Sequence, residues 1–195
     1  TLQKFDAVFR YSKVTGLIDG ADDSILSNIT TVKIRKDFQP LISTSAKYNI
    51  YFRNALYNPH SGHMASAGGI LTSSGFKIDG NTNECFFDDD GAGNVRLYYV
   101  SGGIKNYLNS TQGTINYSTG AITINSLNIA SISNIDGVAS TVIRLTVVPN
   151  SNDVVPVRDQ IVEMDIANSN ITVTADSFVG GSAEAGVGYT TTSSY

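Results

Sequence analysis

The residues best suited to chemistry form an acidic turn at positions 88–94, with the sequence DDDGAGN. Several carboxylates on a glycine-rich turn can surround a hard cation such as calcium. If Gly91 takes the invariant sixth position of an EF-hand loop, positions 1 and 12 are Phe86 and Leu97, so the bidentate acid at position 12 is missing. Asp, Asn and Gly also favour tight turns. The sequence therefore favours a turn and leaves open whether Asp88 and Asp90 hold a cation.

The other candidates for catalysis or metal binding lack partners. His60 and His63 share a short loop, but a metal needs three or four ligands, and a solvated loop explains them better. Cys85 lies in an alternating apolar stretch, which indicates a buried structural thiol. No Gly-x-Ser-x-Gly motif occurs, and the two Gly-x-Gly triplets lack the third glycine of a dinucleotide loop. We therefore expect no enzyme, no cofactor and no metal site.

The composition excludes several protein classes. The 195 residues carry a net charge of -4, with 15% charged and 41% hydrophobic residues. An acidic chain with scattered Lys and Arg argues against a nucleic-acid partner. No stretch approaches the ~20 apolar residues of a membrane-spanning helix, so we expect no membrane insertion. A single cysteine cannot form an intrachain disulfide.

The charge is distributed unevenly along the chain. Residues 1–105 carry 11 basic and 10 acidic side chains, whereas residues 106–195 carry 2 and 7. The second half is therefore acidic, and it could dock on a basic surface of a partner.

The N-terminal segment is predicted to be helical. Apolar residues from Phe5 to Ile18 follow an approximate 3.6-residue period, Asp6 could cap the start, and Gly16 and Gly20 mark the end. From Thr30 the pattern alternates, which predicts a half-buried strand.

The rest of the chain reads as strands and turns. A strand at 48–53 is followed by a predicted hairpin at 84–100 around the acidic turn, and by another at 113–124 around Gly120. A third pair joins 141–148 to 160–166, with Met164 and Ile166 facing inward, and Ile171 and Val173 complete the pattern. The fold class is mainly β (α+β), with antiparallel sandwich or barrel-like sheets and a short helical N-terminal segment.

Four segments are predicted: a helical entry segment with the first strand (1–36), a β-rich domain with hairpins (37–130), a C-terminal β segment (131–179) and a flexible tail (180–195). Because the chain starts at Thr1 without Met, we expect it to be part of a longer polypeptide.

The segment 149–160, together with the C-terminal tail 180–195, is the predicted interface. Two prolines flank a polar turn between strands, and proline cannot donate to a sheet, so the segment is an edge, a crossover or a loop against another chain. Arg158 is the only basic residue after Arg144, and in this acidic region it could anchor an ion pair within the subunit or across an interface. The candidate interface residues are Pro149, Asp153, Pro156, Arg158 and Gln160.

A set of sequence segments is informative through its joint order and spacing, although none of the segments is a catalytic motif. These segments lie at 16–19 and 23–32, 59–62, 69–70 and 74–76, 88–99, 113–124, and 144–149 with 152–160. Together they resemble the C-terminal part of the baseplate wedge subunit of T4-type contractile-tailed phages, a relative of the baseplate J-like proteins. The likeness spans about residues 8 to 175.

The resemblance implies a structural component of the virion tail baseplate, assembled in the host cytoplasm. Such subunits join neighbouring wedges in the inner ring around the hub and rearrange when the sheath contracts. The implied partners are other baseplate wedge proteins and copies of the chain itself, in a ring or dimer. The alternative is a β-sandwich adhesin that binds a glycan or host surface through Tyr-rich strands, although Trp, the favoured sugar platform, is absent.

Overall fold

The computed structural model describes residues 7–59, 69–156 and 164–175. The chain divides into two compact units, Thr1–Val162 and Glu163–Tyr195. The described part of the second unit holds one 3-10 turn, η1 (Ile166–Asn168). The described part of the first unit contains α1 (Tyr11–Asp19), β1 (Ile34–Phe38), β2 (Ser45–Tyr51), β3 (Thr72–Ser73), β4 (Phe76–Ile78), β5 (Cys85–Asp89), β6 (Asn94–Ser101), β7 (Ile104–Asn116), β8 (Ala121–Ile132) and β9 (Ile143–Val147).

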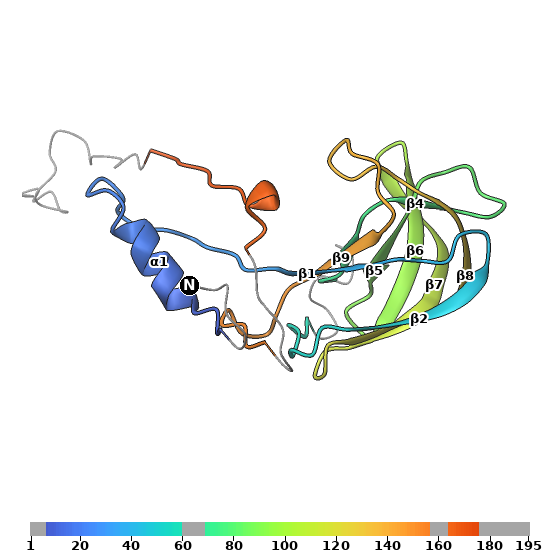
Figure 1. Cartoon of the computed structure of the whole chain (residues 1–195), viewed down its shortest axis with the longest axis horizontal. Coiled ribbons are helices and arrows are strands. Elements are labelled where there is room, and N and C mark those ends of the chain that lie inside the picture. Colours follow the sequence, from blue (N-terminus) through green and yellow to red (C-terminus); the bar gives the residue numbers. More distant parts are fainter. Residues whose placement is uncertain (1–6, 60–68, 157–163, 176–195) are drawn as a thin grey trace, which may run out of the picture. The chain divides into compact units, whose positions relative to one another are not determined.

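Five antiparallel strands close into a barrel. The larger sheet has the order β2-β8-β4-β5-β6-β7, and a further pairing of β7 with β8 closes β4 to β8 into a ring (Figure 1). β2 pairs with β8 outside this ring. The mainly β, antiparallel fold with a short N-terminal helix confirms the predicted fold class.

A three-stranded sheet, β1-β9-β3, shares the hydrophobic core of the barrel. The inward residues of β9, Ile143, Leu145 and Val147, are fully buried, as are Phe76 and Phe87 of the barrel. The two phenyl rings lie 4.7 Å apart between centroids. One continuous core therefore holds both sheets together.

Both hairpins predicted from turn residues are present. β5 and β6 pair from Cys85↔Tyr99 to Asp89↔Val95 around the acidic turn. β7 and β8 pair up to Asn116↔Ala121, and Gly120 in their turn has φ +68°, a conformation that favours glycine.

The helix begins later than its apolar period predicts. Phe9 is extended and forms a β-bridge with Val154, so α1 starts two residues further on. Gly16 lies inside the helix, and Gly20 follows its last residue, as predicted. Asp6, the predicted cap, lies outside the described residues.

The predicted pairing of 141–148 with 160–166 is wrong for the described residues. β9 pairs instead with β1 and β3. Met164 and Ile166 are 51% and 80% exposed, and Ile171 and Val173 are also exposed. Asp165 accepts hydrogen bonds from Asn168 and Ser169, and this local turn competes with a strand at these positions. Residues 160–163 lie outside the described part.

We expect Gly113→Ala to destabilise the barrel. Gly113 pairs with Val95 of β6 and with Ile124 of β8, and an added Cβ would lie 2.0 Å from the backbone oxygen of Thr123. Because backbone must move to make room, the free energy of unfolding should fall by roughly 1–3 kcal/mol in a denaturant titration.

Gly16→Ala is the matched control, since nothing lies within 4 Å of its added Cβ. In a helix, this change should leave stability unchanged or raise it by up to about 1 kcal/mol. Equal effects of the two substitutions would contradict the steric role of Gly113.

Candidate functional site

The first carboxylate of the acidic turn, that of Asp88, lies in a buried ion-pair network. The Asp88 side chain is 1% exposed, and its Oδ1 accepts a hydrogen bond from Arg96 Nε at 2.9 Å. Its Oδ2 accepts from Lys105 Nζ at 2.8 Å and from the Tyr107 hydroxyl at 3.1 Å. Two cationic side chains therefore contact one buried carboxylate and offset its negative charge.

Aromatic rings complete this network. The Arg96 guanidinium lies 4.4 Å from the centroid of the Tyr107 ring, and Lys105 Nζ lies 4.3 Å from that of Tyr98. Burial alone would lower the pKa of Arg96 and of Lys105, but the hydrogen bonds and the charge of Asp88 raise both pKa values above their usual range. The network thus locks β5, β6 and β7 together.

The side chain of Asp89 lies on the opposite face of the same strand, toward the core. It is fully buried, and its Oδ1 accepts the backbone N–H groups of Ile70 and Leu71, each at 2.7 Å. Its Oδ2 accepts the Tyr117 hydroxyl at 2.6 Å. Burial, followed by this hydrogen bond, raises the pKa of Tyr117 above its usual value of 10.0. Asp89 therefore holds two other segments against the turn.

Asp90 organises the turn itself. Its Oδ1 accepts the backbone N–H of Ala92 at 2.8 Å and that of Asn94 at 2.9 Å. Burial would raise the pKa of Asp90, but the hydrogen bonds from Asn94 and Ala92 outweigh it and lower the pKa below 3.8. This is the turn chemistry that the sequence favours.

These contacts argue against a calcium loop. Two cationic side chains lie on the carboxylate of Asp88, and the carboxylate of Asp90 accepts three hydrogen bonds from the turn. A hard cation would have to displace these donors. Among the described residues, no group of three or more His, Cys, Asp or Glu side chains is placed to hold a metal ion.

The ion-pair network was not predicted, although the sequence contains a signal for part of it. In an antiparallel hairpin, opposite positions have a constant sum of residue numbers. The pairing of Cys85 with Tyr99 therefore puts Asp88 opposite Arg96, as the structure shows. Lys105 and Tyr107 come from the next strand, so their approach required the order of strands in the sheet.

The remaining chemical candidates are placed as follows. Cys85 is fully buried, as predicted, and burial raises the pKa of its thiol. His60 and His63 lie outside the described residues. The described residues contain no helix with the length and hydrophobicity of a membrane span.

The structure places the described part of the predicted interface segment against its own chain. Pro149 is buried and bridges Leu56, and Pro156 is also buried. Asp153 pairs with Arg10. Arg158, Gln160 and the tail 180–195 lie outside the described residues. Contact of this segment with another subunit stays a prediction.

Five residues join this segment to the start of α1, and we call them the clasp: Phe9, Arg10, Tyr11, Asp153 and Val154. The backbones of Phe9 and Val154 exchange two hydrogen bonds, of 2.9 and 3.1 Å. Arg10 donates to Asp153 Oδ2 at 2.9 Å, and the Tyr11 N–H donates to Oδ1 at 2.8 Å. Asp153 therefore caps a helix whose own N-cap residue, Arg10, makes no side-chain cap.

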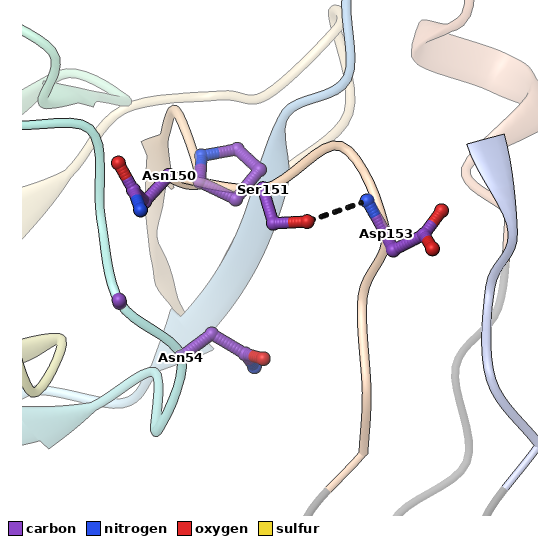
Figure 2. Close-up of a pocket in the computed structure, with 6 residues that line it drawn as sticks. Asn54, Asn150, Ser151 and Asp153 are labelled. Carbon is purple, nitrogen blue, oxygen red and sulfur yellow. Dashed lines mark hydrogen bonds between the residues drawn. The ribbon is translucent and has the colours of Figure 1, made fainter.

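A small cavity of about 70 Å³ lies beside the clasp, lined by Asn54, Ala55, Pro149, Asn150, Ser151 and Asp153. The Ser151 hydroxyl accepts the Asp153 N–H at 3.1 Å, and the Asp153 carboxylate points away from Asn54 and Asn150 (Figure 2). Because this carboxylate binds Arg10 and Tyr11, it serves the clasp rather than the cavity.

Apolar side chains of the segment that follows the clasp remain exposed. No residue of α1 is buried, and Leu17 is 75% exposed. Leu26 and Ile29 are 67% and 99% exposed. All three side chains lie within one segment of the chain, residues 17–29, and are available for contact with a partner.

Residues 1–37 match the family model described as baseplate structural protein gp6, C-terminal domain III. No curated protein and no solved structure shows significant similarity to the chain. The matched segment contains α1, three clasp residues and β1 except for Phe38. The match supports a T4-type baseplate protein.

We expect Asp88→Ala to lower the free energy of unfolding by roughly 2–4 kcal/mol, because it removes the buried carboxylate that both Arg96 and Lys105 contact. The partial exposure of Lys105 keeps the loss below that of a fully buried pair. Denaturant unfolding measures the change.

Asp23→Asn is the control, because it removes an exposed carboxylate and should change stability by less than about 0.5 kcal/mol. A loss no larger than this for Asp88→Ala would show that the network does not stabilise the sheet.

We expect the clasp to open in acid. The Tyr11 N–H and then the Arg10 side chain lower the pKa of Asp153 below 3.8. Because the folded-state pKa is lowered, the contribution of this carboxylate is complete above about pH 3.8 and is lost as the pH falls through the folded-state pKa. Amide exchange at Tyr11, compared with that at Leu97 in the barrel, measures the opening.

Asp153→Asn removes the titrating group, so the acid-dependent increase at Tyr11 should disappear. If the variant keeps the same pH dependence at Tyr11 as the unmodified chain, another group controls the clasp.

Proposed function

We propose that the chain is a structural, non-catalytic component of a T4-type phage tail baseplate. The observation that carries this proposal is the match of residues 1–37 to the baseplate family. The family implies a location in the virion tail and contacts with other baseplate proteins. The comparisons give no support to the adhesin alternative.

The finer assignment is a wedge subunit that contacts other wedge proteins and copies of itself in the inner ring, and that rearranges when the sheath contracts. The resemblance of segments between residues 8 and 175 motivates this assignment. The exposed Leu17, Leu26 and Ile29 support it, because they lie within the segment that matches the family model. Burying such side chains against a partner would stabilise an assembly.

The non-catalytic assignment rests on how the reactive groups are used. The carboxylates of Asp88, Asp89 and Asp90 accept hydrogen bonds from side chains and backbone that fix the barrel. Cys85 is fully buried, and burial disfavours its thiolate. These groups stabilise the fold, and a role in assembly requires no further chemistry from them.

The test places Leu17→Asp and Ile29→Asp in the complete protein during phage assembly. Both side chains are exposed, so the fold should persist while incorporation into tails falls at least about tenfold, because a charge would be buried at the contact. Quantitative mass spectrometry of purified tails measures incorporation.

Ser12→Asp and Thr31→Asp are matched controls, since they add the same charge at exposed polar positions of the same segment. Normal incorporation of the Leu17 and Ile29 variants, equal to these controls, would contradict a packing role for this surface. Absence of the unmodified protein from purified tails would overturn the proposed function.

A further inference from the structure

Hydrogen bonds connect the helix to the chain that follows it, within residues 10–30. The Tyr11 hydroxyl donates to the backbone oxygen of Thr30 at 3.1 Å. The Asn28 side chain donates to the backbone oxygen of Thr15 at 3.3 Å and to the carboxylate of Asp19. The helix and the chain that returns along it therefore form a small lobe, residues 10–30, with internal hydrogen bonds of its own.

Few contacts fix this lobe to the remainder of the first unit. Within the described residues, the hydrogen bonds that the lobe makes to the rest of the chain end on Asp153, and those of the preceding residue, Phe9, end on Val154. At its other end the lobe continues through residues 31–33 into β1, and these three residues belong to no helix or strand. The lobe is thus held by the clasp on one side and by a short extended linker on the other.

The apolar part of the clasp is separate from the main core. Phe9 and Val154 are 9% and 6% exposed, yet neither belongs to the core cluster that joins the barrel to the three-stranded sheet. Opening the clasp would therefore leave that core intact, and it would free one backbone N–H and one C=O on each side for pairing.

We propose that the segment Phe9–Tyr11 is an exchangeable strand, which can leave Asp153 and Val154 of its own chain and bind the same two residues of a second copy. Both arrangements contain the same two backbone hydrogen bonds, the same ion pair and the same helix cap. Among the described residues, the two arrangements differ in the path of residues 31–33, and they also differ in the entropy of association, so proximity of copies in an assembly favours exchange. The inference rests on the proposed function in one respect, which is that copies of the chain meet.

The test mixes two charge variants of the purified chain. In Arg10→Asp, position 10 repels Asp153 of the same chain, and in Asp153→Arg, position 153 repels Arg10. Each variant alone is mismatched in both the closed and the exchanged arrangement. A mixed dimer with exchanged strands has two complementary clasps, one with the original charges and one with reversed charges.

We expect the mixture to form a dimer whose dissociation constant is about tenfold lower than that of either variant alone, since two repulsive pairs become two attractive ones. Light scattering after size-exclusion chromatography, with one variant carrying a fluorophore, measures the mixed species. A cation at position 153 also faces the N-terminus of α1, but this cost is equal in the closed and the exchanged arrangements and cancels in the comparison.

The double variant Arg10→Asp with Asp153→Arg is the control, because it restores a complementary pair within one chain and should dimerise no more than the unmodified protein. Circular dichroism shows that each variant keeps the barrel. A mixture with no more dimer than its separate components overturns the exchange. That result would leave incorporation into tails unaffected, so it is distinguishable from a failure of the proposed function.

Discussion

The fold depends on one stretch of β7 that pairs on both of its edges. Gly113 and Thr114 are paired with Val95 and Asn94 of β6 and with Ile124 and Thr123 of β8 at the same time. This double pairing turns an open sheet into a ring, because β8 also pairs with β4. A barrel closed in this way has no free edge between its strands, and its interior must then be filled by side chains.

Closure of the ring explains how two adjacent carboxylates can be buried on one strand. Successive residues of a strand face opposite sides, so Asp88 and Asp89 are served by different donors. Asp88 accepts hydrogen bonds from side chains of β6 and β7, and Asp89 accepts them from the backbone N–H groups of Ile70 and Leu71. A buried charge is stable only when such donors are fixed in place, and here the paired strands fix them.

The sequence predicted what depends on neighbouring residues. The hairpin around Asp88–Asp90, the turn at Gly120, the burial of Cys85 and the mainly β class all follow from local alternation and turn residues. The partner of β9 could not be predicted in this way, because the alternation of Ile143, Leu145 and Val147 shows which side is buried but not which strand lies beside it. Its longer partner, β1, is more than a hundred residues away in sequence, and its second partner, β3, also lies far from it.

In the candidate site too, features that depend on neighbouring residues could be predicted, whereas contacts between distant residues could not. Two prolines marked the segment 149–160 as one that cannot continue a sheet, and the structure buries both Pro149 and Pro156. The sequence could not show that Asp153 caps a helix 142 residues earlier, since an isolated carboxylate carries no signal of its partner. The chemistry of the contact also does not require both sides to belong to the same chain. The cation, the two backbone groups and the helix N-terminus can bind Asp153 and Val154 of their own chain or of a second copy equally well. What decides between them is the path of residues 31–33 and the local concentration of copies, and both are properties of an assembly rather than of a sequence.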